Sequence, residues 1–540
     1  MQKALQPKNV ASFQRSLDLI RTGKLNDAEK ILRVMLRTEP TAIDIRANLA
    51  FIAFKRGDYL KACEIYAEIL PDAPNDPEFL NRFAVAAMHV GRLDEAEQAL
   101  LQVVELAPNG YDSWMNLCAL AGFQGKDTQG MRYAARALAI RPDAAGGYVN
   151  LGSCLQMCNK LDEAAHAFET ALLLDGTQLS AIINLGVIAA KQGKDEEALR
   201  YFDRAIVNAS EADAAKLNEA KFYKSICLLR LSRLKEAWEL YDCGFFPSLT
   251  HGRSPRRSFS VPQWQGQALN ADQTLLCWKE QGVGDELLFL SCLPDAIKQA
   301  GRLIVECDAR LVSPLSRSFP SVTFRAAEFA NDPVRSPVHH DYDFHIPMGS
   351  LFGLCRPDIA SFSGAGTIIQ PLDALKRRYE GRIGKGDGRL KVGICWRSGT
   401  LSPERNAHYT SISDWGPIFA SRSDADFYSL QYGECEEELL NAHRHFGVHI
   451  NRWPDIDYKN SFEDLFALAS ALDMVITVGT AVSTITAAVG TRTVLMSLPS
   501  WTSFGTDRFL PFPAVELVSA PIGGQVVDLI PQIAELLRSV

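Results

Sequence analysis

The sequence predicts an N-terminal all-α repeat superhelix followed by an α/β region with two parallel sheets. Two observations support this prediction. Turn-forming residues recur every 34 positions through the first 240 residues, and short apolar runs alternate with amphipathic stretches in the remainder. At 540 residues the chain has room for roughly three to four domains, or for a repeat array plus one or two.

Composition excludes several classes of protein. Hydrophobic residues make up 47% of the chain and charged residues 22%, values typical of a globular protein with a packed core. The net charge of −8 and the lack of a long basic run argue against a nucleic-acid partner. No stretch approaches the ~18 uncharged apolar residues of a membrane span, and residues 1–21 lack the apolar core of a signal peptide. The twelve cysteines form no Cys-x-x-Cys pair, so we expect reduced thiols in a cytoplasmic protein.

The repeat predicts a solenoid of helical hairpins over residues 1–243. The recurring turn positions are Gly23, Gly57, Gly91, Gly125, Asn159 and Gly193. An alanine follows most of them after five residues, with Gly130 in its place in the fourth copy, and a proline follows four of them after seventeen. The turn residue separates two helices, the small residue lets them approach closely, and the proline ends the second helix. Each hairpin leaves apolar surface for the next to cover. This pattern resembles the tetratricopeptide repeat, whose solenoids bind extended peptides on the concave face.

An asparagine recurs at one position of the repeat, nine residues before the turn. The series consists of Asn48, Asn116, Asn150 and Asn184, with Arg82 interrupting it. An amide side chain carries a donor and an acceptor, so a row of them can pair with a peptide backbone of any sequence. The tetratricopeptide superhelix of the O-GlcNAc transferases has a similar asparagine ladder. The alternative interpretation is that these amides only form hydrogen bonds between repeats.

Residues 244–269 break the pattern and predict a linker. Turn formers dominate the segment, and three arginines, Arg253, Arg256 and Arg257, lie within it. We expect these charges to be solvated, with an anion site as the alternative.

The remainder predicts two α/β halves, residues 270–385 and 386–540, joined at the glycine-rich and charged segment 381–388. Strands separated by helical stretches form parallel sheets with crossover helices. The expected strands are Thr274–Trp278, Leu303–Cys307, Val322–Ala326, Asp343–Pro347, Val392–Trp396, Phe427–Gln431, Met474–Val478 and Thr493–Leu498. Two Rossmann-like halves with a short joint resemble the GT-B glycosyltransferases, whose ligands bind between the halves. By the same resemblance, the stretch Val526–Leu537 is expected to cross back to the first half.

A glycine loop follows the first expected strand. Gly282 and Gly284 allow a tight turn and close approach to a ligand, and Asp285 projects at the carboxyl end of the strand. The loop matches neither the Walker pattern nor the dinucleotide fingerprint. It resembles the Glu-Gln-Gly-x-Gly-Asp motif of bacterial tetratricopeptide–glycosyltransferase fusions of the flagellin type and, more distantly, the loop of the heptosyltransferases. That resemblance implies that Asp285 is the catalytic base. The alternative is that Asp285 caps a helix starting at Glu286.

The second half supplies the expected donor site. Arg397 and Ser398 follow its first strand and, by resemblance to the fusions, face the donor phosphates, while Gln431 resembles a strand-end residue near the nucleotide base. A strand-to-helix junction offers free amides to a pyrophosphate at Thr480, Ala481, Val482 and Ser483. The relatives carry an acid and a histidine where this chain has Gly479 and Ser483.

These features predict an inverting glycosyltransferase that moves a sugar from a nucleotide donor to serine or threonine of a protein held by the repeats. The resemblance suggests flagellin as the acceptor and CMP, UDP or GDP as the donor nucleotide, and it implies no bound metal and no further cofactor. Three Asp-x-Asp triplets, a pattern that holds a metal in GT-A enzymes, occur at unrelated places in an acidic chain and are interpreted as chance. The histidines between His443 and His449 lack the His-Glu-x-x-His arrangement. The sequence is compatible with a homodimer and does not determine the oligomeric state. The alternative function is a non-catalytic adaptor with a degenerate transferase domain.

Overall fold

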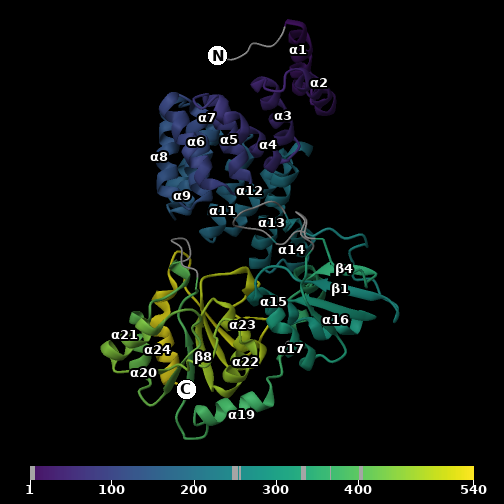
Figure 1. Cartoon of the computed structure of the whole chain (residues 1–540). Coiled ribbons are helices and arrows are strands. Elements are labelled where there is room, and N and C mark those ends of the chain that lie inside the picture. The colour runs from purple at the N-terminus through teal and green to yellow at the C-terminus, as the bar shows by residue number, and fades with distance from the viewer. Residues whose placement is uncertain (1–6, 246–252, 254–256, 330–335, 365, 400–405) are drawn as a thin grey trace. The chain divides into compact units, whose positions relative to one another are not determined.

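The computed structural model describes residues 7–245, 253, 257–329, 336–364, 366–399 and 406–540 (Figure 1). They form two compact units, Met1–Asn184 and Leu185–Val540. The division falls within helix α11 (Leu179–Lys191), so the last repeats group with the α/β region. The repeat elements end with the 3-10 helix η3 (Asp242–Gly244), close to the expected end at residue 243.

The repeats are built from pairs of helices, as predicted. The first unit contains α1 (Pro7–Arg21), α2 (Leu25–Thr38), α3 (Ile43–Lys55), α4 (Tyr59–Ile69), η1 (Leu70–Asp72), α5 (Pro77–His89), α6 (Leu93–Leu106), α7 (Tyr111–Phe123), α8 (Asp127–Ile140), α9 (Ala145–Met157) and α10 (Leu161–Leu174). The second unit continues after α11 with α12 (Asp195–Asn208), η2 (Glu211–Asp213), α13 (Ala214–Arg230) and α14 (Leu234–Tyr241).

The six turn positions confirm the predicted backbone. All have positive φ, from 59° at Asn159 to 81° at Gly57. Ser232 takes the equivalent place before α14 with φ of 60°. Left-handed backbone is cheap for glycine and tolerated by asparagine, which explains why these residue types recur.

The α/β region contains two parallel sheets. The first has the order β3-β2-β1-β4. Its elements are β1 (Thr274–Trp278), α15 (Val283–Leu290), α16 (Leu293–Gln299), β2 (Arg302–Cys307), α17 (Ala309–Ser318), β3 (Thr323–Ala326), β4 (Phe344–Pro347), α18 (Met348–Cys355) and η4 (Ala360–Phe362). Helix α19 (Asp373–Arg382) then leads to the second sheet.

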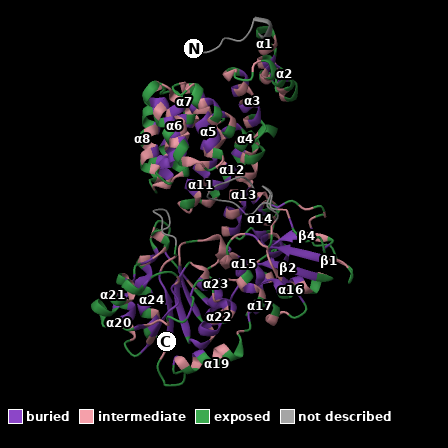
Figure 2. Ribbon diagram, viewed as in Figure 1, coloured by how far each residue is buried: buried purple, intermediate pink, exposed green. Residues whose placement is uncertain are grey.

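The second sheet has the order β10-β9-β8-β5-β6-β7, the strand order of a Rossmann fold. Its elements are β5 (Lys391–Cys395), η5 (Asn406–His408), η6 (Ile412–Trp415), α20 (Gly416–Ser421), β6 (Asp426–Ser429), α21 (Glu436–Phe446), β7 (Ile450–Asn451), α22 (Phe462–Ala471), β8 (Met474–Val478), α23 (Ala481–Ala488), β9 (Thr493–Ser497), η7 (Trp501–Ser503), β10 (Val515–Ser519), η8 (Val526–Leu529) and α24 (Ile530–Arg538). Its central strands β5 and β8 are buried along their whole length (Figure 2).

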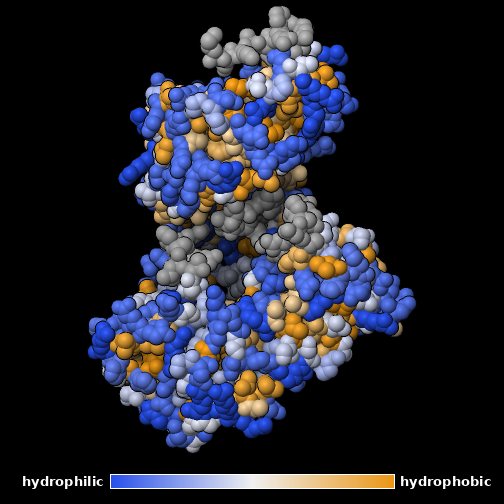
Figure 3. Space-filling model, viewed as in Figure 1, coloured by the Kyte–Doolittle hydropathy of each residue, from blue (hydrophilic) through white to orange (hydrophobic). Residues whose placement is uncertain are grey.

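All eight expected strands are present, within two residues at each end. Strands β7 and β10 were not expected. The expected crossover of the C-terminal helix is wrong, because Ile530, Ile533 and Leu537 of α24 lie in the core of the second half. Hydrophilic residues cover much of the visible surface, with hydrophobic ones in smaller groups (Figure 3). Among the described residues, no helix has both the length and the apolar character needed to cross a bilayer.

The fourth repeat departs from its neighbours at a pair of thiols. Sγ of Cys118 on α7 lies 3.7 Å from Sγ of Cys154 on α9, and both side chains are buried. A Cβ on Gly130 would lie 2.7 Å from the Cys154 sulfur. The glycine that replaces the usual alanine therefore makes room for this thiol.

We expect Gly130→Ala to destabilise the first unit by ~1–3 kcal/mol, although alanine is the better helix former, because the methyl group overpacks against Cys154. The matched control is Gly122→Ala on α7, whose Cβ would have nothing within 4 Å. Urea denaturation should show that Gly122→Ala is neutral or stabilising. Adding Cys154→Ala to Gly130→Ala should recover part of the loss, and no recovery would mean that the sulfur is not the obstacle.

Candidate active site

The glycine loop of the first half packs against the start of α23 in the second half. A Cβ on Gly284 would lie 3.3 Å from the Ala481 Cα and 3.5 Å from the Thr484 hydroxyl. Both elements follow the carboxyl ends of central strands, α15 after β1 and α23 after β8. Ligands of doubly wound sheets bind at these strand ends. The structure thus brings together the loop and the helix start that the sequence nominates separately.

Asp285 lies in the first turn of α15. The helix begins at Val283 with Gly282 as its N-cap, so Asp285 is its third residue and not the cap of a helix starting at Glu286. The carboxylate nevertheless caps α15 as the acid of a capping box, which is the role that the alternative interpretation gives it. The carboxylate accepts a hydrogen bond of 3.4 Å from the Gly282 N–H. Burial raises the pKa of Asp285 to about 6, the Gly282 amide opposes this rise, and the charge of Glu280 adds to it. A carboxyl with this pKa is ionised near pH 7 and more basic than an ordinary aspartate, which suits a general base.

The neighbouring Glu286 has a structural role. It is fully buried, forms an ion pair with Lys279, and accepts a 2.8 Å hydrogen bond from the Asp308 N–H at the start of α17. Its carboxylate therefore joins β1, β2 and α17. Of the two adjacent acids, Asp285 is the one that is free of a cationic partner among the described residues.

The start of α23 has the form expected of an anion site. Thr480 is the N-cap, and its hydroxyl accepts from the Val482 N–H at 3.3 Å. The Ser483 hydroxyl donates to the Thr480 carbonyl at 2.7 Å, so this side chain is directed back along the chain. The Ser483 N–H is also bonded, to the Thr480 carbonyl at 3.1 Å, so two of the first-turn amides have partners within the turn. The positive end of the helix dipole favours an anion at this position.

The side chains of Arg397 and Gln431 are both hydrogen-bonded to other residues of the second half. Arg397 forms a bidentate ion pair with Glu438 of α21, with Nε to oxygen distances of 2.9 and 3.0 Å. Gln431 is fully buried; its carbonyl accepts from the N–H groups of Trp396 and Arg397, and its amide donates to the Arg397 and Tyr432 carbonyls. Both residues hold the loop after β5. Ser398 follows in the same loop, and its hydroxyl lies 2.9 Å from that of Tyr432.

The linker arginines differ from their expected solvated state. Arg253 and Arg257 have fully buried side chains and pair with Glu280 and Glu306, each less than 2% exposed. Arg256 lies outside the described residues. Sequence reasoning did not pair either arginine with its glutamate, because the two partners are distant in sequence, although Glu280 begins the Glu-Gln-Gly-x-Gly-Asp motif. The only available signal was a charged residue inside or beside an apolar strand.

The repeat asparagines are half-buried on the first helices of their hairpins. The side-chain amides of Asn48 and Asn184 donate to carbonyls four residues earlier, at 2.8 and 2.9 Å, and that of Asn116 donates to Asn81 at 3.0 Å. These bonds use one N–H each. An acceptor oxygen and a second N–H per side chain are therefore compatible with a peptide ligand.

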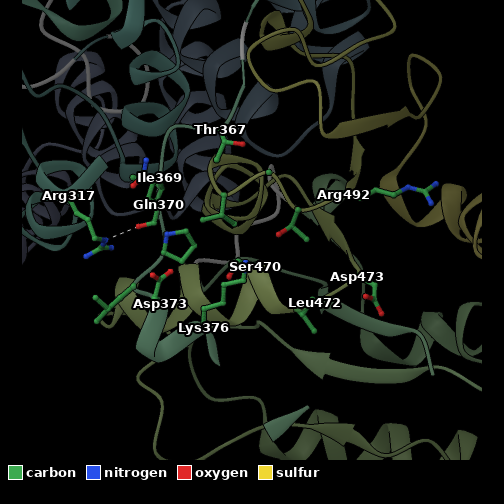
Figure 4. Close-up of a pocket in the computed structure, with 15 residues that line it drawn as sticks. Arg317, Thr367, Ile369, Gln370, Asp373, Lys376, Ser470, Leu472, Asp473 and Arg492 are labelled. Carbon is green, nitrogen blue, oxygen red and sulfur yellow. Dashed lines mark hydrogen bonds between the residues drawn. The ribbon is translucent and has the colours of Figure 1, made fainter. Parts of the chain in front are cut away.

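The cavity in Figure 4 has a volume of about 630 Å³ and lies at the opposite ends of the second sheet's strands. Asp473 and Arg492, which precede β8 and β9, line it together with the segment that leads into α19. Arg317 points into it and is already bound, by Nε to the Gln370 carbonyl at 2.9 Å and by ion pairing to Glu463. Because its walls come from the amino ends of the strands, this cavity is separate from the Gly284–Ala481 contact.

No group of three or more His, Cys, Asp or Glu residues within the described ranges is arranged to hold a metal ion.

Family models described as tetratricopeptide repeat match residues 19–81, 53–120 and 159–215. With the two parallel sheets, these matches define the class: a tetratricopeptide-repeat solenoid joined to an α/β region. Protein FlbA of Caulobacter vibrioides is 27% identical over 512 residues, which cover 92% of this chain and 78% of FlbA.

Other relatives match smaller parts. Human Protein O-mannosyl-transferase TMTC1 is 25% identical over 217 residues, 39% of this chain and 24% of that protein. A solved tetratricopeptide repeat protein from Parabacteroides merdae covers 43% of this chain and 90% of its own, with 14% identity and a TM-score of 0.39. MamA covers 29% of this chain and 91% of its own, with 22% identity and a TM-score of 0.27. Scores at this level add nothing on function.

We expect Asp285→Asn to stabilise the protein at neutral pH. A folded-state pKa of about 6, above the ordinary 3.8, means that folding favours the protonated form. This stability is complete below pH 3.8 and is lost as the pH rises to about 6. In urea denaturation, Asp285→Asn should exceed the wild type by ~2–3 kcal/mol at pH 8, and the gap should close near pH 4.

Asp308→Asn is the matched control with the opposite sign. Hydrogen bonding to Arg310 lowers the pKa of Asp308 to about 2, so its contribution is present above pH 3.8 and is lost as the pH falls toward 2. Its removal should destabilise the protein at pH 8. Parallel stability profiles for wild type and Asp285→Asn would show that the Asp285 carboxyl titrates normally.

Proposed function

We propose that the chain is an inverting, metal-independent glycosyltransferase that moves a sugar from a nucleotide donor to a serine or threonine of a protein acceptor. The close approach of Gly284 to Ala481 carries this proposal, because Asp285 directly follows Gly284 and Ala481 begins the helix that we assign to the leaving phosphate. The similarity to FlbA over most of the chain and the printed name of TMTC1, a protein O-mannosyl-transferase, support it.

In the proposed reaction Asp285 takes the proton of the acceptor hydroxyl, and the oxygen attacks the anomeric carbon from the face opposite the nucleotide. The bond to the donor phosphate breaks with inversion. The first-turn amides of α23 stabilise the charge that develops on the departing phosphate. The solenoid holds the acceptor polypeptide, for which flagellin is our candidate, and CMP, UDP and GDP are the candidate nucleotides.

The test separates donor binding from chemistry. A thermal-shift screen of CMP, UDP, GDP and ADP should identify the nucleotide, since a ligand at ~100 times its Kd adds ~2.7 kcal/mol of stability. With the corresponding nucleotide sugar, Asp285→Asn should lower turnover by ~10²–10⁴-fold while nucleotide affinity stays near the wild-type value.

Ala481→Pro should do the reverse. Ala481 is the first residue of α23, a position that accepts proline, so the change removes one amide donor and keeps the helix. Nucleotide affinity should fall ~10-fold. The matched control is Asp373→Pro at the first position of α19, which should leave nucleotide affinity unchanged. Full turnover in Asp285→Asn, or unchanged affinity in Ala481→Pro, would contradict the assigned roles.

The repeat asparagines should bind the acceptor. Replacing Asn116, Asn150 and Asn184 together by alanine should weaken binding of the acceptor protein ~10-fold or more, because several backbone hydrogen bonds are lost at once. Nucleotide affinity should not change. Fluorescence anisotropy with a labelled acceptor measures this, and equal acceptor affinity would assign these amides to repeat packing alone.

A non-catalytic adaptor is the second candidate. Two observations favour it. Arg397 is paired with Glu438, and the Gln431 side chain is bonded to the backbone after β5. Gly479 and Ser483 also stand where related transferases carry an acid and a histidine. Acceptor binding without transfer from any nucleotide sugar would support this candidate.

A further inference from the structure

Glu280 lies in the loop between β1 and the glycine turn and is fully buried. Its two oxygens accept from the guanidinium of Arg253, at 2.5 and 2.6 Å, and one of them also accepts from the Gly349 N–H at 2.6 Å. A buried carboxylate is tolerated when its lone pairs are matched by donors in this way. The residue is therefore fixed from two directions, by the linker and by the start of α18.

Arg253 extends this connection to the end of the repeats. Its guanidinium donates to Asp242 of η3 at 2.7 Å and to the Ser350 hydroxyl at 2.9 Å, and it lies over the rings of Tyr241 and Phe245 at 4.4 and 4.3 Å. The last repeat elements, the linker and the first sheet thus converge on one arginine beside the glycine loop.

The loop itself needs such support. Gln281 has a positive φ of 58°, a conformation that costs a non-glycine residue about 1–3 kcal/mol. Its side-chain amide donates to the Tyr241 hydroxyl at 3.2 Å. Two successive residues, Glu280 and Gln281, are therefore tied to the same part of the chain just before Asp285.

We infer that Glu280 is a positioning residue for Asp285: clamped by Arg253, it seats the glycine loop and keeps a buried negative charge on the segment that leads into Asp285. This inference rests on the proposed function, because it assigns a partner to the proposed base. It gives the end of the solenoid a direct part in shaping the reaction centre.

The charges around Asp285 support this role. The titratable groups that act on or are affected by its carboxyl are Glu280 on its own loop and Tyr241 at the end of α14. From α23, the neighbours of the loop are Ala481 and Thr484, which carry no charge. After burial, the Glu280 charge is the contribution that raises the pKa of Asp285.

Glu306 provides a matched control. It lies in β2 of the same sheet, is 1% exposed, and pairs with a linker arginine, Arg257, at 2.6 Å and with Arg325 at 3.0 Å. Its environment resembles that of Glu280 in burial and pairing, but its partners do not include the glycine loop. Comparable loss of fold stability is therefore expected from either substitution.

The experiment compares Glu280→Gln with Glu306→Gln in the full chain, using the nucleotide sugar that supports transfer in the wild type. Glutamine keeps the size of the side chain and one acceptor oxygen, replaces the other acceptor by an amide N–H donor, and removes the charge. Glu280→Gln should therefore move the acid limb of the kcat/KM profile to lower pH. Glu306→Gln should leave its midpoint unchanged. Equal midpoints in both variants and the wild type would overturn the inference.

Two further measurements keep the result decisive. Infrared titration of ¹³C-carboxyl aspartate, as the difference between each protein and its Asp285→Asn form, follows the same ionisation without activity. A lower infrared midpoint in Glu280→Gln than in the wild type supports the inference, whether or not sugar is transferred. The absence of sugar transfer in the wild type would refute the proposed function and not this inference. Should Glu280→Gln not fold, Glu280→Asp keeps the charge and unseats the loop, and should lose ~10²-fold in kcat relative to Glu306→Asp. Equal kcat values would overturn it.

Discussion

The site depends on how closely two backbones can approach. Gly284 lies against Ala481 because neither residue interposes a large side chain, and even a methyl group on Gly284 would be within 3.3 Å of the Ala481 Cα. This contact connects the carboxyl ends of β1 and β8 across the two halves. Burial is the largest cause of the raised pKa of Asp285, the residue that follows Gly284. The chemistry of the carboxyl is thus a consequence of packing.

The same arrangement sets stability against reactivity. A carboxyl whose charged form is disfavoured by burial weakens the folded state at neutral pH, and the fold must offset this elsewhere. The ion pair between Arg253 and Glu280 and that between Lys279 and Glu286 flank the loop. Glu286 pairs with a cation and accepts from a backbone donor, while Asp285 accepts a long hydrogen bond from the Gly282 N–H and has no cationic partner among the described residues. Two adjacent acids therefore acquire different roles from their partners.

Local pattern was enough to predict much of the fold. The 34-residue period predicted the helical pairs and the left-handed turns, and apolar runs predicted eight strands. Strand β7 has two residues and no run to detect, whereas β10 buries Val515 and Val518, which are three positions apart and do not follow the two-residue alternation of a strand. The C-terminal helix was assigned by resemblance, and its apolar face fits the second half instead. For the site, the sequence nominated both the glycine loop and the start of α23. It did not predict the partners of Arg253, Arg397 or Gln431, because hydrogen bonds between distant segments leave no periodicity.

The thiol pair in the fourth repeat shows a constraint on how the repeats of this solenoid can be exchanged during evolution. Cys118 stands where the next two repeats have Gly152 and Gly186, and each of those glycines faces a phenylalanine that fills the space a Cβ would need. Cys118 packs against Ala134 instead, and the missing side chain of Gly130 leaves room for the Cys154 sulfur. Volume is conserved across each interface by residues from different helices. The repeats of this chain are consequently not interchangeable. A hairpin moved to another position would bring one member of a compensating pair of side chains and leave the other behind. Recombination between repeats would therefore be tolerated only where neighbouring hairpins are exchanged together.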